Sequence, residues 1–361
     1  MFTSILISKA LLALGVFVLS LTIAAYSTYG ERKVAAFMQD RVGPDRAGLW
    51  GLLQPLADGL KMFTKEDFIP AAANKWLFIL GPCLAMFVAF MTGVVIPWAR
   101  PATLTTGETF HFQVSDINIG ILYVFGIVSM GVYGIMIGGW ASNNKYALMG
   151  TIRASSQMIS YELAMGLSLV ALIMTTGTLS LNSIVEQQDK GLCNFVYQPL
   201  GFLIFLICAF AETNRAPFDL PETESELVGG YHTEHTSMKL GFYLFSEYIN
   251  MFISSAVMAT LYFGGFHFPF EDAVISRIGE YWTRFIGFGV FMGKIIFFIF
   301  LFMWIRWTLP RFRYDQLMNL GWKTLLPLSI FNLVITGIVI AVKEGWFKEP
   351  FEALLVFLHL K

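Results

Sequence analysis

Charged side chains are scarce in this sequence. Asp, Glu, Lys and Arg make up 14% of the 361 residues, where a soluble domain has roughly 25%. Hydrophobic types reach 56%, above the roughly 45–50% that is usual in soluble domains. So few charges disfavour a water-soluble enzyme, and so much hydrophobicity excludes intrinsic disorder. The net charge of −1 leaves no basic footprint for a nucleic-acid partner.

Residue types that hold metals and redox centres are equally rare. The three cysteines, at positions 83, 193 and 208, form no CxxC pair, so the chain cannot build an iron–sulfur cluster or a zinc site from cysteine. An odd number of cysteines also argues against a disulfide framework. None of the five histidines lies mid-span, which excludes a di-haem cytochrome, and no GxGxxG or Walker loop indicates a nucleotide site. We therefore expect no metal site and no cofactor bound by this chain alone.

Long apolar runs are what the sequence has instead. Five stretches contain no Asp, Glu, Lys or Arg, and three more contain only one. Because a bilayer core needs about 20 apolar residues as a helix, we predict an all-α integral membrane protein with eight transmembrane helices, forming a single polytopic domain over residues 1–361. The first run is interpreted as a retained helix, since it is too long for the core of a signal peptide and lacks a clear cleavage site. The eight predicted spans are 10–30, 76–99, 117–144, 154–185, 191–211, 240–270, 285–305 and 324–342.

Basic residues are distributed unevenly between the loops. The loops after spans one, three, five and seven carry 15 Lys and Arg, whereas the remaining loops and the two termini carry 8. Basic loops stay on the cytoplasmic side of a membrane, so the two long loops, 31–75 and 213–239, are predicted to be cytoplasmic. With an even number of spans, both termini are then expected on the outer side.

Three charges fall inside predicted spans: Glu162, Glu247 and Lys294. A charge at the bilayer centre costs roughly 2.5–3.5 kcal/mol, and intramembrane acids are functional by default. Glu247 begins a one-sided polar stripe that continues with Asn250 and Ser254. We interpret the two glutamates as proton carriers and Lys294 as a counter-charge for a glutamate, because buried charges are usually paired. Structural ion pairs with Lys294, with loop arginines or with partner subunits are the alternative.

The loop that follows the fifth span is rich in acids. It opens with Glu212, and Arg215 is the only opposite charge nearby. Neighbouring carboxylates in a low-dielectric site cannot all be ionised, so some of them have raised pKa values and can take up and release protons. A series of such groups from a loop into the membrane is what a proton path needs, although solvated or partner-facing acids are also common. The other acids of this loop are Asp219, Glu222, Glu224, Glu226 and Glu234.

The loop 31–75 contains an amphipathic segment. Over residues 49–63 the apolar side chains recur at helical spacing, with Asp58, Lys61 and Lys65 opposite them. This pattern predicts a helix lying in the membrane interface. Such a helix either stabilises the protein surface or walls an entrance for an amphiphile that arrives from the lipid.

Taken together, these stretches resemble one family along the chain from the first span to the eighth. The family is the quinone-proximal membrane subunit of respiratory complex I, known as the H subunit of NADH–quinone oxidoreductase in bacteria and as NADH dehydrogenase subunit 1 in mitochondria. The matching motifs are 31–33 (ERK), 39–44 (QDRVGP), 54–61 (QPLADGLK), 65–66 (KE), 211–222 (AETNRAPFDLPE), 224–231 (ESELVGGY) and 310–318 (PRFRYDQLM).

The resemblance implies a subunit without a redox centre in a proton-pumping NADH:quinone oxidoreductase. Quinone would be the substrate, partner membrane and peripheral subunits would carry FMN and iron–sulfur clusters, and the site would be an energy-converting membrane such as the bacterial cytoplasmic membrane. The implied quinone-chamber residues are Glu31, Arg32, Asp58, Lys61, Phe218 and Asp219. The implied proton path comprises Glu162, Glu212, Glu222, Glu224, Glu226, Glu234 and Glu247, with Arg215 and Lys294 as counter-charges.

Three other interpretations stay open at this point. A membrane subunit of an energy-converting hydrogenase shares much of this organisation but uses no quinone. A stand-alone cation/proton transporter would work by itself when reconstituted. A purely structural anchor is the third, and the buried glutamates argue against it.

Overall fold

The computed structural model describes residues 2–103, 109–189, 191–220, 228–269 and 271–344. Within these ranges seven helices are long and apolar enough to cross a membrane, and a two-residue hairpin, β1 (Ala102–Thr103) with β2 (Thr109–Phe110), is the only sheet. The prediction of an all-α integral membrane protein is therefore confirmed. The seven helices are α1 (Phe2–Met38), α3 (Lys75–Thr92), α4 (Gly120–Ala141), α5 (Lys145–Thr176), α10 (Ser237–Tyr262), α12 (Glu280–Thr308) and the continuous run of α13 (Tyr314–Asn319), η4 (Leu320–Leu325) and α14 (Leu326–Lys343).

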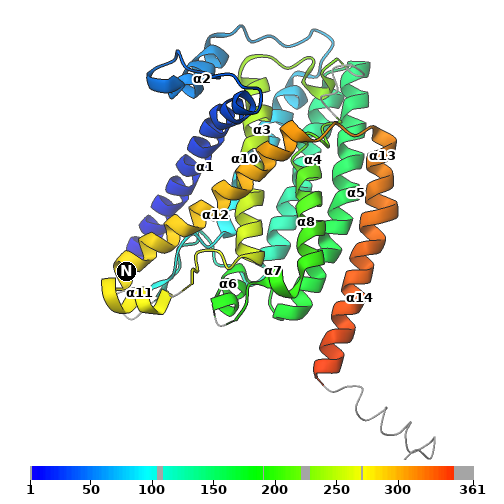
Figure 1. Ribbon diagram of the computed structural model, residues 1–361. Helices are drawn as coiled ribbons and strands as arrows, with labels where there is room; N and C mark the ends of the chain where they lie inside the picture. Colours follow the sequence, from blue (N-terminus) through cyan, green and yellow to red (C-terminus); the bar gives the residue numbers. More distant parts are fainter. Residues whose placement is uncertain (1, 104–108, 190, 221–227, 270, 345–361) are drawn as a thin grey trace, which may run out of the picture.

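The fifth predicted span, 191–211, is shorter in the structure than expected. It is split into α7 (Asn194–Tyr197) and α8 (Pro199–Glu212), because Pro199 has no backbone N–H and fits only the first turn of a helix. The 14 residues of α8 rise about 21 Å, less than the roughly 30 Å of a bilayer core. Figure 1 nevertheless shows α8 within the bundle, beside α5.

The ends of α5 illustrate how local sequence sets helix boundaries. At its start the Asn144 side chain accepts a hydrogen bond from the Tyr146 amide at 2.9 Å, which satisfies a backbone donor that no earlier turn can reach. At its end Gly177 takes a left-handed φ of 68°, which costs glycine little. The remaining short elements are η1 (Leu49–Gly51), α2 (Gln54–Thr64), η2 (Gly93–Val95), α6 (Leu181–Asp189), η3 (Gly230–His232) and α11 (Glu271–Ile278).

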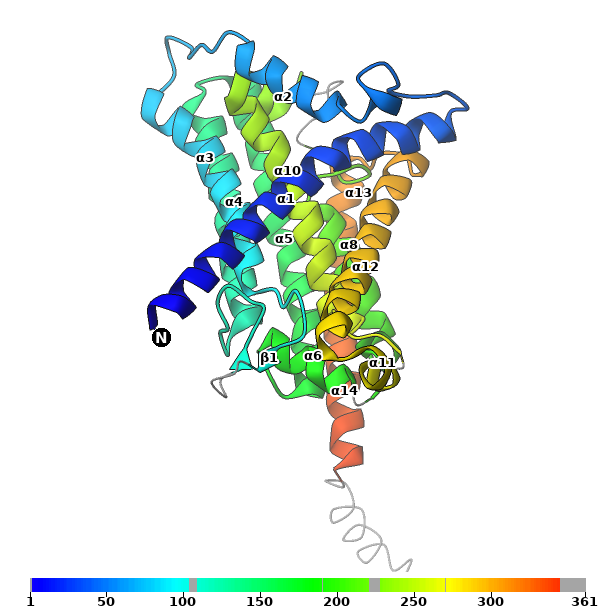
Figure 2. The ribbon, with the colours of Figure 1, turned by 90° about the vertical axis from the view of Figure 1, so that its left-hand side faces the viewer.

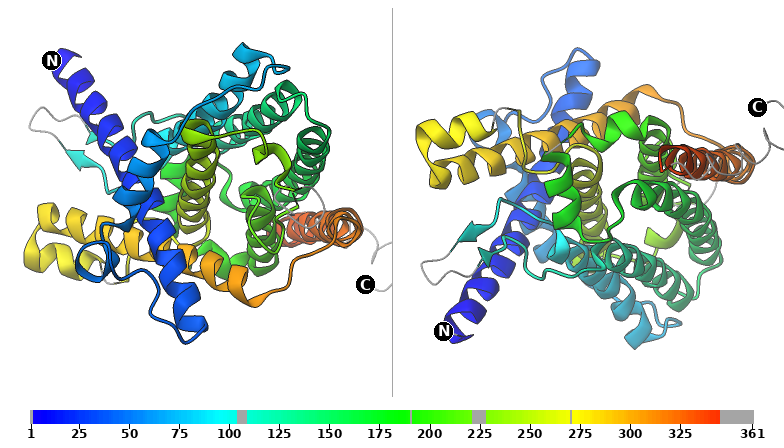
Figure 3. Two further views of the ribbon diagram at one scale, coloured as in Figure 1. Left: turned by 90° about the horizontal axis from the view of Figure 1, so that it is seen from above. Right: turned by 90° about the horizontal axis from the view of Figure 1, so that it is seen from below.

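The helices form a bundle with α10 near its centre. Figure 3 shows α3, α4, α5, α8 and α10 grouped together, while α14 lies at the edge, and α1 and α12 run obliquely across the group in Figure 2. In the most apolar 18-residue stretch of α10, 72% of the residues are buried. In the corresponding stretch of the run that ends in α14, only 22% are buried. Residues that line a site on α10 are therefore the ones best shielded from lipid.

The two long loops meet at one end of the bundle. α2 lies at this end, whereas the start of α1, α6 and α11 lie at the other (Figure 1). Ser237 donates a hydrogen bond to the Met62 carbonyl at 2.9 Å, and the Lys239 ammonium donates to Asp67 at 2.5 Å. These contacts join loop 31–75 to the end of loop 213–239, as expected for loops on the same side of a membrane.

The amphipathic segment 49–63 is not one continuous helix. Trp50 adopts a left-handed φ of 54° inside η1, and α2 begins only at Gln54. The apolar face is as predicted, since Leu56, Leu60 and Phe63 are 63%, 65% and 70% exposed. An apolar face this exposed in the single chain needs lipid or a partner to cover it.

Glycines allow α4 to approach its neighbours closely. A Cβ added at Gly138 of α4 would lie 1.9 Å from the Tyr243 hydroxyl, and one added at Gly139 would lie 1.7 Å from the Thr151 hydroxyl. The sequence Gly134-xxx-Gly138-Gly139 is a small-residue pattern that favours close helix contact. The structure shows this close contact between α4 and its neighbours.

Gly138→Ala is expected to destabilise the bundle by about 1–3 kcal/mol, because overpacking a tight contact forces neighbours apart. The midpoint of thermal unfolding in detergent measures the effect. Gly126→Ala on the same helix is the matched control, since a Cβ there has no neighbour within 4 Å. Equal midpoints for the two variants would contradict the packing described.

Candidate functional site

Two cavities lie against different faces of α10. The first, here called the inner cavity, is bordered by Glu247, Asn250 and Ser254 of α10. The second, here called the α2 cavity, is bordered by Leu244 and Tyr248 of α10. Residues 247 and 248 are about 100° apart around a helix, so neighbouring side chains of one helix reach both cavities.

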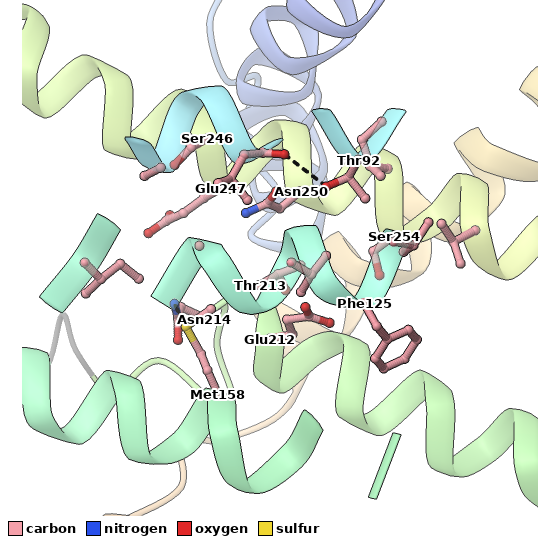
Figure 4. A pocket seen from close by; sticks show the side chains of 18 of the residues that line it. Thr92, Phe125, Met158, Glu212, Thr213, Asn214, Ser246, Glu247, Asn250 and Ser254 are labelled. Atoms are coloured by element: carbon pink, nitrogen blue, oxygen red, sulfur yellow. Dashed lines mark hydrogen bonds between the residues drawn. The ribbon is translucent and has the colours of Figure 1, made fainter. Parts of the chain in front are cut away.

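The inner cavity has a volume of about 70 Å³ and lies between α3, α4, α5, α8 and α10. Most of its wall is apolar, but Glu212 and Glu247 both belong to it, together with Thr92, Asn250 and Ser254. Figure 4 shows Glu212 on one side and Glu247 with Asn250 on the other. The polar stripe predicted on α10 therefore lines a cavity. Its polar groups give water molecules the partners that they need in a buried site.

A second acid, Glu162, lies near Glu212. Glu212 closes α8, and Glu162 of α5 is near enough to interact with it electrostatically. The Ser129 hydroxyl of α4 donates a hydrogen bond to Glu162. Two intramembrane carboxylates from different helices are thus neighbours, as the proton-path hypothesis requires.

Glu247 has a tyrosine on one oxygen and an arginine near the other. The Tyr231 hydroxyl donates to Oε1 at 3.0 Å, and Arg215 Nε lies 3.8 Å from Oε2. The Glu247 side chain is 10% exposed and that of Arg215 is 7% exposed. The expected role of Arg215 as a counter-charge for an acid of this site agrees with these contacts.

Arg215 makes its closest ion pair with Glu31. Its Nη1 lies 2.9 Å from Glu31 Oε2, and its guanidinium carbon lies 3.8 Å from the centre of the Tyr248 ring. The Tyr248 hydroxyl also donates to Glu31 Oε2, at 2.8 Å, and Arg306 of α12 pairs with Oε1. Burial lowers the pKa of Arg215, but the Tyr248 hydroxyl and the carboxylates of Glu31 and Glu247 outweigh it and raise that pKa. The guanidinium therefore stays charged.

The α2 cavity has a volume of about 160 Å³ and lies between α1, α2 and α10. Arg32 and Asp58 line it and form an ion pair at 2.7 Å. Tyr248 lines it as well, and its hydroxyl binds Glu31. Lys61 is exposed on α2 and lies outside this lining.

Phe218 and Asp219 lie away from both cavities. They are buried, 5% and 3% exposed, and neither belongs to a cavity lining. Arg311 pairs with Asp219 at 2.9 Å, and the Phe218 carbonyl accepts a hydrogen bond from Gln157 at 2.8 Å. In this chain they tie the loop after α8 to α5 and to the segment after α12.

Lys294 does not accompany the acids of the inner cavity. Its ammonium donates to the carbonyl oxygens of Phe263, Gly265 and His267 at 2.7 to 2.8 Å. No carboxylate of the described chain lies within ion-pair distance of it. Backbone carbonyl groups therefore take the place of the glutamate that we expected as its partner. A lysine in a span pairs as readily with carbonyl groups as with an acid, and the sequence does not distinguish the two.

His267 belongs to a polar cluster at the same end as α11. Its Nδ1 lies 2.5 Å from Glu271 and 3.3 Å from Asp189, and Arg100 pairs with Glu271 at 2.7 Å. Burial raises the pKa of Glu271, but His267 and Arg100 outweigh it and lower that pKa. Asp189, His267 and Glu271 could reach one metal ion, but the Arg100 guanidinium already neutralises Glu271.

The remaining acids of the predicted path are placed only in part. Glu234 accepts a hydrogen bond from Asn144 at 2.6 Å, which puts it at the loop end of α5 and outside the inner cavity lining. Glu222, Glu224 and Glu226 lie outside the described residues.

Three site residues were not identified from the sequence: Tyr231, Tyr248 and Arg306. Tyrosine is compatible with a membrane interface, so neither tyrosine stands out in an apolar sequence. Arg306 follows a span in a position typical of a cytoplasmic anchor. Only the fold brings them to Glu31 and Glu247.

Comparisons with known proteins agree with this arrangement. A family model described as NADH dehydrogenase matches residues 11–337. An H subunit of NADH-quinone oxidoreductase from Cytophaga hutchinsonii is 63% identical over 332 residues, covering 92% of this chain and 96% of that protein. The H subunit of Flavobacterium johnsoniae is 58% identical over 338 residues (94% and 96%), and one from Geobacter metallireducens is 48% identical over 328 residues (91% and 95%). These relatives do not favour the hydrogenase or stand-alone transporter interpretations.

Proposed function

The chain belongs to the NADH dehydrogenase family, as an H subunit of respiratory complex I, and from that premise we propose that it walls the quinone chamber on one face of α10 and carries the first section of the proton path on the other. The observation that supports this most is the buried bridge between the two cavities. Tyr248 lines the α2 cavity and binds Glu31, Glu31 pairs with Arg215, and Arg215 lies 3.8 Å from Glu247 of the inner cavity.

Coupling follows from the electrostatics of that bridge. Reduction of a quinone takes up protons and places transient negative charge beside the α2 cavity, where it competes with Glu31 for Arg215. Two unit charges about 4 Å apart interact by about 4 kcal/mol at an effective dielectric constant near 20. A small displacement of Arg215 therefore changes the charge balance at Glu247 by an amount comparable to the roughly 2.3 kcal/mol needed to move a charge through 100 mV.

The proton path proposed within this chain runs from Glu247 across the inner cavity to Glu212 and Glu162. Electrons do not pass through it; they arrive from partner subunits that carry FMN and iron–sulfur clusters, and quinone reaches the α2 cavity from the lipid past the exposed face of α2. The subunit lies in an energy-converting membrane, the bacterial cytoplasmic membrane, with loop 31–75 inside and both termini outside. Glu222, Glu224, Glu226 and Glu234 extend the proton path, and Lys61 the chamber entrance.

Filling the α2 cavity is the experiment that tests this function. Gly59 belongs to its lining, and a Cβ added there meets no heavy atom within 4 Å. Gly59→Phe is expected to raise the KM for quinone at least about tenfold, because a lost contact of about 1.4 kcal/mol is already tenfold. Inhibitor-sensitive NADH:quinone activity of the purified complex measures it, while NADH oxidation by a water-soluble artificial acceptor reports intact partner subunits.

The matched control is Gly289→Phe. This α12 glycine also has open space around an added Cβ and lines neither cavity. A KM for quinone that stays normal in Gly59→Phe would refute the proposed quinone chamber. So would a KM that rises equally in both variants.

A further inference from the structure

Glu247 needs a hydrogen-bond donor that Arg215 does not supply. Arg215 Nε lies 3.8 Å from its carboxylate, which is beyond hydrogen-bond distance. The same Nε has no hydrogen-bond acceptor within the described ranges of the chain. Among the described residues, Arg215 thus attracts Glu247 across 3.8 Å without donating a hydrogen bond to it from Nε.

Arg215 is kept from closing this gap by its other contacts. Glu31 holds Nη1 at 2.9 Å, and the Tyr248 ring lies 3.8 Å from the guanidinium carbon. Arg306 holds the other oxygen of Glu31, so Glu31 is fixed as well. A guanidinium bound on its edge and on its face has little freedom to turn towards the Glu247 carboxylate.

In contrast to Arg215, Tyr231 is held by its surroundings with its hydroxyl against Glu247. It is 1% exposed, and its ring packs edge-on against Tyr243 at 5.1 Å and beside His232 at 4.0 Å. Its element, η3, is pressed against α5, where a Cβ on Gly150 would lie 2.7 Å from Gly230. The hydroxyl therefore stays within 3.0 Å of Oε1 without needing the carboxylate to hold it there.

We propose that Tyr231 is a positioning residue for the proton path, whose hydroxyl stabilises the ionised form of Glu247 and directs the carboxylate along the inner cavity wall. The proposal rests on the proton path described above. Losing a hydrogen bond to a charged group is equivalent to about one to two pH units of titration. Without the hydroxyl, the neutral acid persists to higher pH and releases its proton more slowly.

Several other charged or titratable groups face Glu247, and Tyr231→Phe leaves them unchanged. Their electrostatic effect on Glu247 is the same in the wild type and in the variant, because the lost hydroxyl donates its hydrogen bond to Glu247 and not to them. Among the described residues, Arg215 lies 3.8 Å from the Glu247 carboxylate, Glu212 of α8 and Tyr243 of α10 line the same cavity, and His232 packs against Tyr231. Glu31 of α1 acts on Glu247 through Arg215, and Tyr248 of α10 and Arg306 of α12 bind Glu31.

The pH profile of the purified complex tests the proposal, measured as inhibitor-sensitive NADH:quinone turnover from about pH 6 to 9, the range in which raised carboxyl pKa values fall. Tyr231→Phe keeps the ring and removes only the hydroxyl, and its profile is expected to move to higher pH by at least about one unit, with turnover lost at the acidic end and regained at the alkaline end. Tyr161→Phe is the matched control. Tyr161 is equally buried, but its hydroxyl donates to the Leu317 carbonyl at 2.9 Å, so its profile is expected to stay at the wild-type position.

A second variant removes the contact from the other side. Glu247→Asp keeps the acid but withdraws it from Tyr231 by one methylene, and the same alkaline shift is expected, so the test survives if Tyr231→Phe does not assemble. An unshifted profile in an assembled variant overturns the role of Tyr231, as does an equal shift in Tyr161→Phe. Glu247→Gln separates this failure from that of the proton path itself: if that variant pumps normally, the path is wrong, whereas if it is inactive and Tyr231→Phe is unshifted, only the role of Tyr231 is wrong.

Discussion

Glu247→Gln is expected to lower proton-coupled quinone turnover by about 100-fold, because a positioned group that takes up and releases a proton contributes roughly 10²–10⁴-fold and an amide can do neither. Glutamine has nearly the same size and accepts the Tyr231 hydrogen bond at 3.0 Å through its amide oxygen. The subunit should therefore still fold and assemble. Proton uptake by proteoliposomes during NADH oxidation measures the loss.

An acid outside the site provides the control for that experiment. Glu280 on α12 is half exposed and pairs with Arg284 within the same helix, so Glu280→Gln is expected to pump at the wild-type rate. Oxidation of NADH by an artificial acceptor should be unchanged in both variants. Wild-type pumping by Glu247→Gln would remove this residue from the path.

Arg215→Met is expected to prevent stable assembly. Removing one partner of a buried ion pair costs roughly 3–5 kcal/mol, and here two carboxylates lose the same cation: Glu31 at 2.9 Å and Glu247 at 3.8 Å. That loss is a large part of the roughly 5–15 kcal/mol by which a folded protein is stable. The amount of complete complex on a native gel and its unfolding midpoint measure the effect.

Arg313→Met is the comparison for Arg215→Met. Its ion pair with Asp315 is 70% exposed on the arginine side, and exposed pairs contribute little, so normal assembly is expected. If Arg215→Met assembles as well as Arg313→Met, Arg215 is not the centre of the bridge between the cavities.

The sequence predicted most of the fold because lipid imposes a simple rule on it. A helix that must cross a hydrocarbon layer needs a long run without charge, and seven such helices are found within the described chain. The rule fails for α8, where apolar composition continues through residues 191–198 but Pro199 starts a new helix. A different expectation, the continuous amphipathic helix over residues 49–63, fails at Trp50, because its left-handed backbone interrupts the helix.

The candidate site was predictable where an isolated charge marks it. Glu162, Glu212 and Glu247 stand out because burying an acid is expensive, and the structure brings Glu212 and Glu247 to one cavity. Pairing across the fold is different, since nothing in the order of residues links Glu31 to Arg215 or Arg306. Lys294 shows the same limit, because backbone carbonyl groups leave no trace in the sequence.

An electron cryo-microscopy map of the complete complex, at a resolution that shows ordered water, tests the central claim most directly. Water molecules are expected in the inner cavity, connecting Glu247 to Glu212 past Asn250 and Thr92, with a quinone or its headgroup density in the α2 cavity. A dry inner cavity filled by apolar side chains, with each glutamate closed in an ion pair of its own, would contradict the proposed coupling.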